Sequence, residues 1–196
     1  YAMYSSTRLN YNNATNPAPD YYSLMPSYFY DVWGGSGSSS ASDLEAWQTA
    51  VNYFKASKAH RQINWDKLYY ANKMASAQGA DAMYYQQAYH DDQLALTLSS
   101  ILHKDLTNHS FFDAGVNLST NKGMHYQTME DLLGATQFHN TNYYVAGTYD
   151  INDPRALYDV RDGNKLVREG DRFGYDYNIF VNRAQAWAGY QTEIKW

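Results

Sequence analysis

Three long stretches of the chain alternate apolar and polar residues with a period of two, as a β-strand with one apolar face does. They run from Tyr84 to His103, from Phe112 to Tyr126 and from Phe173 to Trp196. In the first two stretches, one face carries Leu94, Leu96, Leu98, Leu102, Phe112, Ala114, Val116 and Leu118. The opposite face carries Gln93, Thr97, Ser99, Asp113, Gly115, Asn117, Ser119 and Asn121. In the third stretch, Ala188, Tyr190, Thr192, Ile194 and Trp196 lie opposite Trp187, Gly189, Gln191, Glu193 and Lys195.

The length of these stretches favours strands that cross a membrane. Each covers about 15 to 24 residues, whereas a strand in a globular protein usually has about 5 to 6. A strand that crosses a bilayer at a tilt needs about 9 to 11 residues, and an apolar face opposite a hydrated one suits a barrel with a wet interior. The pattern therefore predicts an all-β fold, namely part of an antiparallel transmembrane β-barrel with about four long strands. An extracellular β-rich domain with one hydrated face would show the same alternation.

The connections between the expected strands differ greatly in length. Lys104–His109 is a short polar connection that makes residues 84–126 a hairpin, whereas residues 11–79 and 128–171 form long loops. Outer-membrane barrels have short periplasmic turns and long external loops. We therefore expect both long loops outside the cell, the hairpin turn in the periplasm and a last strand over residues 172–196.

Two helices are expected inside the first long loop. Trp47 and its apolar neighbours at helical spacing predict a helix near residues 43–58. Ser42 followed by Glu45 matches a capping box at its start. A second helix is expected near residues 65–77. Three prolines earlier in the loop, at Pro17, Pro19 and Pro26, disfavour regular helix there.

Composition excludes several other classes of protein. The 196 residues carry a net charge of -5 and contain no cysteine, which excludes disulfide scaffolds, thiolate metal sites and cysteine nucleophiles. Mild acidity with scattered Lys and Arg indicates that the chain does not bind nucleic acid. No apolar run is long enough for a transmembrane helix or a signal peptide. Gly34–Ser42 is a flexible low-complexity tract, and a chain that starts at Tyr1 and stops on Trp196 is expected to be a segment.

Aromatic residues make up 17% of the chain, and 21 residues are tyrosines. Tyr and Trp are favoured both at bilayer interfaces and in loops that bind ligands by stacking. We expect Tyr84, Tyr85 and Tyr126 to lie where strands leave the membrane. The loop tyrosines are candidate ligand contacts, although packing of the large loops on each other would also explain them. These candidates are Tyr21, Tyr22, Tyr28, Tyr143 and Tyr144.

The sequence contains no motif for catalysis or for a bound cofactor. The six histidines lack the paired spacing of a zinc site, and alternation splits His90-Asp91-Asp92 between two faces of a strand. The motif of a calcium-binding loop does not fit the sequence around Gly163, because apolar and aromatic residues stand where carboxylates are required. A small hairpin that pairs residues 157–160 with residues 165–168 fits that segment better. We therefore expect no catalytic residue, no metal and no cofactor, and a protein that is not an enzyme.

A series of local motifs follows the chain from near its start to near its end. The motifs are Leu9-Asn10-Tyr11, Asn16-Pro17-Ala18-Pro19-Asp20-Tyr21-Tyr22, Leu24-Met25-Pro26-Ser27-Tyr28, Arg61-Gln62-Ile63-Asn64-Trp65-Asp66-Lys67-Leu68-Tyr69, Lys122–Gly134 (KGMHYQTMEDLLG) and Glu169-Gly170-Asp171-Arg172-Phe173-Gly174-Tyr175-Asp176-Tyr177. In this order the chain resembles TonB-dependent outer-membrane receptors of the Bacteroidetes type.

The resemblance implies a barrel of about 22 strands with an N-terminal plug, which imports a scarce ligand with energy passed from the inner membrane. The chain would be an internal slice of that barrel in the bacterial outer membrane, without the plug. The implied partners are outer-membrane lipid, the TonB energy-transducing complex through parts of the receptor outside this chain, and a surface lipoprotein. The implied ligand is a nutrient such as a siderophore, a glycan or a peptide.

Two other hypotheses fit part of the pattern. A secreted all-β module could hold glycans with exposed Tyr and Trp side chains. Alternatively, the segment could be an assembly intermediate or a client held by another complex. A soluble monomer that buries Leu94, Leu96 and Leu98 between two sheets would eliminate the barrel.

Overall fold

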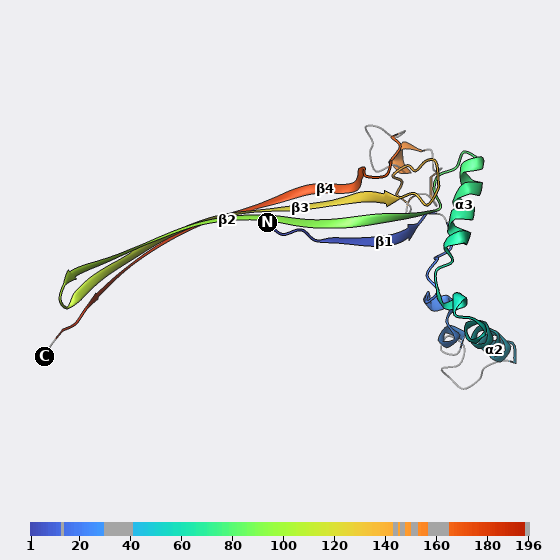
Figure 1. The fold of residues 1–196 in the computed structure, drawn as a ribbon, viewed down its shortest axis with the longest axis horizontal. Helices are drawn as coiled ribbons and strands as arrows, with labels where there is room; N and C mark the ends of the chain where they lie inside the picture. Colours follow the sequence, from blue (N-terminus) through green and yellow to red (C-terminus); the bar gives the residue numbers. More distant parts are fainter. Residues whose placement is uncertain are drawn as a thin grey trace. The chain divides into compact units, whose positions relative to one another are not determined.

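The computed structural model describes residues 1–12, 14–29, 41–142, 145, 148–149, 153–156 and 165–194. This part of the chain is mostly β, with one open antiparallel sheet of four strands and a few short helices (Figure 1). Contacts divide the chain into two compact units. The sheet unit contains Tyr1–Thr7, Ala88–Thr128 and Gly170–Trp196, and the loop unit contains Arg8–Gln87 and Met129–Glu169.

The sheet has the strand order β1-β2-β3-β4. β1 (Ser5–Tyr11) has 7 residues, β2 (Tyr84–Thr107) has 24, β3 (Ser110–Asp131) has 22 and β4 (Arg172–Thr192) has 21. The three long strands run side by side in Figure 1. The sequence pattern therefore predicted the long strands correctly, whereas the fourth strand is short. β1 and β4 are the edges of the sheet formed by the described residues.

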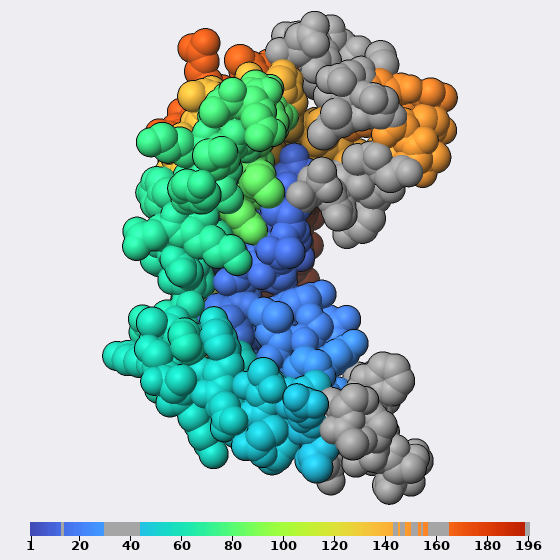
Figure 2. Space-filling view, turned by 90° about the vertical axis from the view of Figure 1, so that its right-hand side faces the viewer, coloured from blue at the N-terminus to red at the C-terminus, as the bar shows by residue number. Residues whose placement is uncertain are grey.

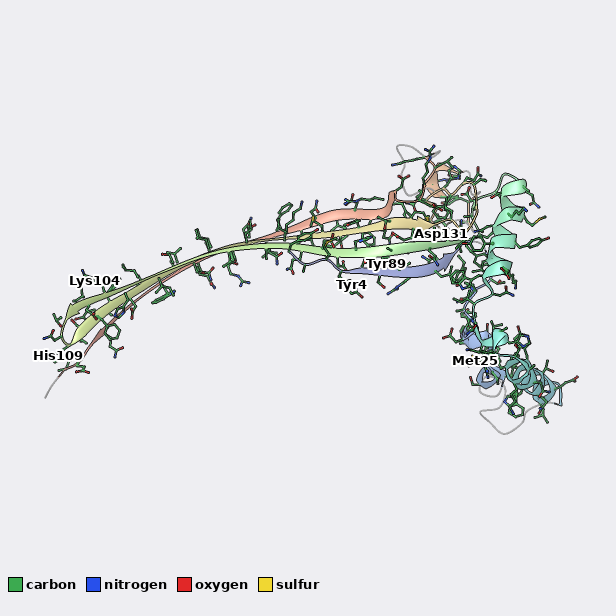
Figure 3. The ribbon with its side chains drawn as sticks, viewed as in Figure 1. Tyr4, Met25, Tyr89, Lys104, His109 and Asp131 are labelled. Atoms are coloured by element: carbon green, nitrogen blue, oxygen red, sulfur yellow. The ribbon has the colours of Figure 1, made fainter. Side chains whose placement is uncertain are left out.

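The turn between β2 and β3 is shorter than the sequence pattern predicts. β2 continues through Thr107 into the expected connection Lys104–His109 and β3 begins directly after it at Ser110, so only Asn108 and His109 remain as turn residues. The Thr107 and Ser110 hydroxyls lie 2.7 Å apart across this turn. A two-residue turn is the commonest hairpin connection. Figure 3 labels Lys104 and His109 at this end of the strands.

β3 and β4 pair in a continuous register from Ser110 opposite Thr192 to Tyr126 opposite Asp176. Residues directly opposite each other in an antiparallel pair share a face of the sheet. This register therefore joins the apolar row predicted on β3 to the alanines of β4, since Val116 faces Ala186.

The register shifts after Tyr126, where β4 contains a bulge. Gly174 in this bulge has a φ of 71°, a conformation that costs glycine little and other residues more. A Cβ atom at this position would also collide with the side chain of Gln127. Glycine is therefore required where the strand changes its register.

Two longer helices belong to the loop unit. α2 (Ala41–Ala56) begins one residue before Ser42, so Ser42 lies inside the helix and the predicted capping box is wrong. Residues 34–40 of the Gly/Ser tract lie outside the described residues.

α3 (Trp65–Ala77) has the bounds that the sequence pattern predicts. Asn64 is its N-cap, and its side-chain oxygen accepts a hydrogen bond of 3.0 Å from the backbone N–H of Lys67. This bond satisfies one of the N–H groups that a helix start leaves without a partner. In Figure 2, α2 and α3 form part of the visible surface. Several large side chains of α3 are exposed, namely Trp65, Tyr69, Tyr70 and Met74.

Three short 3-10 helices complete the described elements: η1 (Tyr22–Leu24), η2 (Ala59–Arg61) and η3 (Pro154–Ala156). Residues 26–29 are also helical, although three prolines disfavoured a helix in this segment. Pro26 stands at the first helical position, where proline is tolerated because the N–H it lacks would have no partner within the helix.

The core of the loop unit joins α3 to the ends of two strands. Leu68, Tyr84 and Leu133 pack together and are each less than 5% exposed. Asn72 of α3 is completely buried. Its amide nitrogen donates to the carbonyl oxygens of Tyr84 (2.8 Å), Leu132 (2.9 Å) and Leu133 (3.2 Å).

The side-chain oxygen of Asn72 accepts from the backbone N–H groups of Met83 (2.9 Å) and Tyr84 (3.0 Å). One amide therefore fixes α3 to the first residue of β2 and to the residues after β3. Leu133 has a positive φ of 49°, which is uncommon for a residue other than glycine. Its burial and its bond to Asn72 hold it in this conformation.

Residues after β3 also attach to the C-terminal end of α3. The Thr136 N–H donates to Ser76 Oγ at 3.1 Å, and the Gln137 amide donates to the Gly79 carbonyl oxygen at 2.7 Å. Leu166 forms an isolated antiparallel bridge with His139. The strand predicted to pair with residues 165–168 covers residues 157–160, which lie outside the described residues.

Candidate functional site

The tyrosines proposed as ligand contacts in the first loop pack against one another. The rings of Tyr21 and Tyr22 lie edge to face at 4.8 Å, and those of Tyr22 and Tyr28 at 5.6 Å. Tyr22 is 63% exposed, whereas Tyr21 and Tyr28 are half-buried. Desolvation, reinforced by the neighbouring Tyr22 hydroxyl, raises the pKa of Tyr21 above its ordinary value. These three rings therefore pack on one another while Tyr22 stays accessible, and their role as ligand contacts remains a prediction. Tyr143 and Tyr144 lie outside the described residues.

A cavity of about 1020 Å³ lies in the loop unit between α2 and the Pro-rich segment. Its walls include Pro17, Leu24, Phe29, Tyr53, Phe54 and His60. The imidazole of His60 stacks on the Tyr53 ring at 4.0 Å, so an aromatic pair forms part of this wall. None of the described candidate tyrosines, Tyr21, Tyr22 and Tyr28, lines the cavity.

The three tyrosines expected where strands leave the membrane have different surroundings. Tyr84 is only 4% exposed and donates a hydrogen bond of 3.1 Å to the Thr15 carbonyl oxygen. It is a core residue of the loop unit, so its ring has no exposed face for an aromatic belt. Tyr85 lies 4.6 Å from the Phe138 ring in the same unit. Of the three residues, only Tyr126 belongs to the sheet unit.

Tyr126 is the centre of a cluster on the apolar face of the sheet. Its ring lies between the imidazole of His90, at 4.5 Å, and the guanidinium of Arg172, at 3.8 Å. Its hydroxyl donates to Asp92 Oδ2 at 3.1 Å. Asp92 is 4% exposed, and its other oxygen, Oδ1, has no hydrogen-bond partner among the described residues. The cluster therefore combines a buried carboxylate with a stacked phenol.

Along the middle of β3, the apolar face of the sheet is the more exposed one. Val116 and Leu118 are 47% and 45% exposed, whereas the alternating residues Asn117 and Ser119 are partly buried. This alternation in exposure is clear because β3 is paired on both sides. A sheet in water normally shows the reverse arrangement, with its apolar face covered and its polar face exposed.

The apolar residues of this face, most of them exposed, form a band with polar limits, which we call the apolar band. On β2 the band lies between Asp92 and Lys104. On β3 it lies between the hairpin turn and Lys122. Within it, Thr120 donates a hydrogen bond of 2.7 Å to Asn182, so these two polar groups satisfy each other. The members from β2 and β3 are Leu94, Leu96, Leu98, Leu102, Phe112, Ala114, Val116 and Leu118. The opposite face is mostly polar, with Ala95, Ile101, Phe111, Ile179, Val181 and Trp187 as exceptions.

The polar face carries an aromatic strip that sequence analysis missed. Tyr89 of β2 and Tyr175 of β4 stack at 6.4 Å, and Tyr175 lies 5.7 Å from Tyr177. The imidazole of His125 on β3 stacks on Tyr177 at 5.1 Å, and its Nδ1 lies 2.7 Å from Asp91 Oδ1. All five residues have odd numbers within period-two strands, which is the signal that could have grouped them. Figure 3 labels Tyr89 on β2.

A second group of ionisable side chains lies at the hairpin end of the polar face. His103 Nδ1 lies 2.5 Å from Asp113 Oδ1, and its Nε2 lies 3.4 Å from Asp105 Oδ1. At the turn, His109 and Glu193 approach to 3.7 Å. Each of these histidines therefore has a carboxylate beside it.

The predicted split of His90-Asp91-Asp92 between two faces is confirmed. His90 and Asp92 contact Tyr126, whereas Asp91 contacts His125 on the opposite face. Within the described residues, no group of three His, Asp or Glu side chains is placed to hold a metal ion.

The chain was compared with known proteins by sequence and by structure. No family model, no curated protein and no solved structure matches it. In the part of the chain that the structure describes, no helix is long and apolar enough to cross a membrane.

Proposed function

We propose that this chain is a segment of the barrel wall of a TonB-dependent receptor in a bacterial outer membrane, where it takes part in importing a nutrient. The observation that carries this proposal is the apolar band, because its side chains are exposed while the polar face of β3 is partly covered. In a lipid-facing sheet the apolar side chains contact hydrocarbon and the polar ones face a wet interior.

The width of the apolar band supports a membrane location. On β2 it occupies residues 93–103, between the charged side chains Asp92 and Lys104. A tilted strand needs about 9 to 11 residues to cross the hydrocarbon core. β2, β3 and β4 all continue beyond the band, as barrel strands do when they extend past the bilayer. Tyr126, with its apolar ring and polar hydroxyl, lies beyond the Lys122 limit, where an aromatic girdle would form.

The connections agree with an outer-membrane orientation. A two-residue turn joins β2 to β3, whereas the connections before β2 and after β3 are long and carry the helices. Short turns are periplasmic and long loops external in such barrels. The long loops, including the cavity beside α2, are therefore placed outside the cell in this proposal.

The motif resemblance narrows the proposal from barrels in general to TonB-dependent receptors. In this proposal, energy comes from the TonB complex through parts of the receptor outside this chain, and a surface lipoprotein is a further partner. The ligand is a nutrient of the siderophore, glycan or peptide class. The competing secreted glycan-binding module would have to cover Leu96 and Leu98, which are 61% and 67% exposed.

Single cysteines test the proposal, since the chain has no cysteine of its own. In cells that carry the protein, a cysteine at Asn140 in the second long loop should react with an impermeant thiol reagent, whereas one at Asn108 in the turn should not. In isolated membranes, a cysteine at Thr97 should react with a water-soluble reagent and one at Leu96 should react only with a lipid-soluble reagent.

Three outcomes would count against the proposal. Equal reactivity of the Leu96 and Thr97 variants towards both reagents would show that the apolar band does not face lipid. Recovery of the protein as a soluble monomer without detergent, with its glycan affinity intact, would favour the secreted module. Labelling at Asn108 but not at Asn140 would invert the orientation and remove the external position of the long loops.

A further inference from the structure

The polar face of the sheet combines aromatic rings with an exposed carboxylate. The aromatic strip consists of Tyr89, Tyr175, Tyr177 and His125, and Asp91 lies at its end, hydrogen-bonded to His125. Tyr177 is 49% exposed, and the side chain of Asp91 is 52% exposed. A ring face and a carboxylate are thus both accessible within one group of contacts that spans β2, β3 and β4.

We infer that the aromatic strip with Asp91 is a binding site for a positively charged group, an ammonium or guanidinium, of the imported ligand. The faces of aromatic rings carry negative electrostatic potential and attract cations. The Asp91 carboxylate adds a formal negative charge beside them. His125 Nδ1 lies 2.7 Å from Asp91 Oδ1, and this contact orients the carboxylate beside the rings.

The charge of the surrounding face favours the same ligand. Counted by alternation along the strands and by the pairing of β1 with β2, the polar face carries Asp91, Asp105, Asp113 and Asp131 against two cations, Arg8 and Arg183. Arg172 lies over Tyr126 on the other face and pairs with Asp176 at 3.1 Å. A face with more carboxylates than cations attracts a cationic ligand and repels an anionic one.

A glycine preserves the geometry of the site. A Cβ atom on Gly123 would lie 3.0 Å from His125 Nε2, a contact too close for an unmoved ring. Gly123 therefore leaves space for the imidazole between Asp91 and Tyr177. A residue with a side chain at position 123 would require the imidazole to shift by a few tenths of an ångström.

This inference rests on the proposed function only where it places the polar face inside a barrel. In that position the aromatic strip would face the route of the ligand. Recognition of a positive charge would then exclude anionic nutrients and select cationic ones, such as peptides rich in Lys or Arg.

Binding of the tetraethylammonium ion to the detergent-solubilised protein tests the inference, with glucose as a neutral probe, and saturation-transfer NMR can measure both. The cation should bind and glucose should not. Asp91→Asn should weaken cation binding about fivefold to tenfold, because the amide can still accept from His125 but carries no charge. Tyr177→Leu should weaken it to a similar extent, whereas Tyr177→Phe should preserve it because the ring remains.

Asp176→Asn is the matched control, since the side chain of Asp176 is 49% exposed and lies on the other face. It should leave cation binding unchanged. Equal binding by the Asp91→Asn and Asp176→Asn variants, or equal binding of glucose and the cation, would overturn the inference. The thiol reactivity of cysteines placed at Leu96 and at Thr97 is measured separately in the background of each variant. Lost cation selectivity with an intact cysteine pattern would therefore refute this site and leave the barrel proposal standing.

Discussion

Replacement of Asn72 by alanine should destabilise the loop unit more than any surface substitution. Asn72 is completely buried and makes five hydrogen bonds to backbone groups of residues 83–84 and 132–133. Alanine removes all five bonds at once and leaves a small polar cavity. The residues that lose their partner belong to the start of β2 and to the segment after β3, so the damage should be local to these two joints.

The size of the effect follows from the groups left without a partner. A buried donor or acceptor that loses its hydrogen bond costs about 1 to 3 kcal/mol. A water molecule entering the cavity could serve up to three of the five groups. The remaining two groups then give a loss of about 2 to 6 kcal/mol. This is a large effect for one substitution. It is the size expected when a buried hydrogen-bond network is broken.

Hydrogen exchange measured by mass spectrometry is the suitable assay, because it reports local opening of the loop unit separately from the sheet unit. Asn52→Ala in α2 is the matched control, since Asn52 is exposed and its side-chain oxygen accepts a hydrogen bond of 3.3 Å from the exposed amide of Gln48. We expect peptides of α3 and of residues 132–139 to lose protection in the Asn72 variant and to keep it in the control.

A second variant separates hydrogen bonding from packing. Asn72→Asp keeps the shape of the side chain but places a carboxylate oxygen against the three carbonyl oxygens that Asn72 now serves. It should destabilise the loop unit at neutral pH at least as much as alanine does. If either variant changed protection by less than the Asn52→Ala control, the amide of Asn72 would not be a structural joint and our reasoning would be wrong.

Two further predictions concern the apolar band and an ion pair of the second loop. Leu96→Arg should cost about 2 to 4 kcal/mol if Leu96 lies near the bilayer midplane, whereas Thr97→Arg should be tolerated; equal losses in refolding from urea into lipid vesicles would contradict this. Asp153 accepts hydrogen bonds from the side chain and backbone N–H of Arg155, which lower the pKa of Asp153 from 3.8 to about 2. The stabilisation from this pair should therefore be complete above about pH 4 and lost as the pH falls through about 2. Arg155→Gln should return the pKa of Asp153 towards 3.8 in an NMR titration, and an unchanged value would refute the pairing.

Alternation along the chain was sufficient to predict the long strands, but it does not predict which residues of neighbouring strands lie opposite each other. The apolar positions from Leu94 to Leu118 fall on one face as expected, because a period of two is fixed by the backbone of a strand. The pairing of β3 with β4 depends on register, which the pattern of one strand does not contain. The aromatic strip was missed for this reason, since His125 meets Tyr177 only in the observed register.

Local sequence patterns predicted features that depend on one helix or strand. They did not predict features that depend on tertiary contacts. Asn64 caps α3 through a bond to Lys67, three residues away, and the bounds of this helix were predicted. Tyr84 looked like an interface residue because it begins a long strand, but packing with Leu68 buries it. No sequence pattern indicated the structural role of Asn72, because a polar residue in a helix usually faces solvent. The backbone groups that it bonds also lie beyond the helix end or far away in the sequence.

The outer edge of β4 has consequences for the handling of the protein. β4 has 21 residues and pairs with β3 on one side, and no described strand pairs with its other side. Such an edge presents a row of N–H and C=O groups that can template another strand. In hydrocarbon, each unsatisfied group costs several kcal/mol. Two copies could join edge to edge, and a synthetic peptide with alternating apolar residues could cap the row. Preparations of the isolated segment should therefore aggregate through intermolecular β-pairing unless such a cap or a neighbouring strand is supplied.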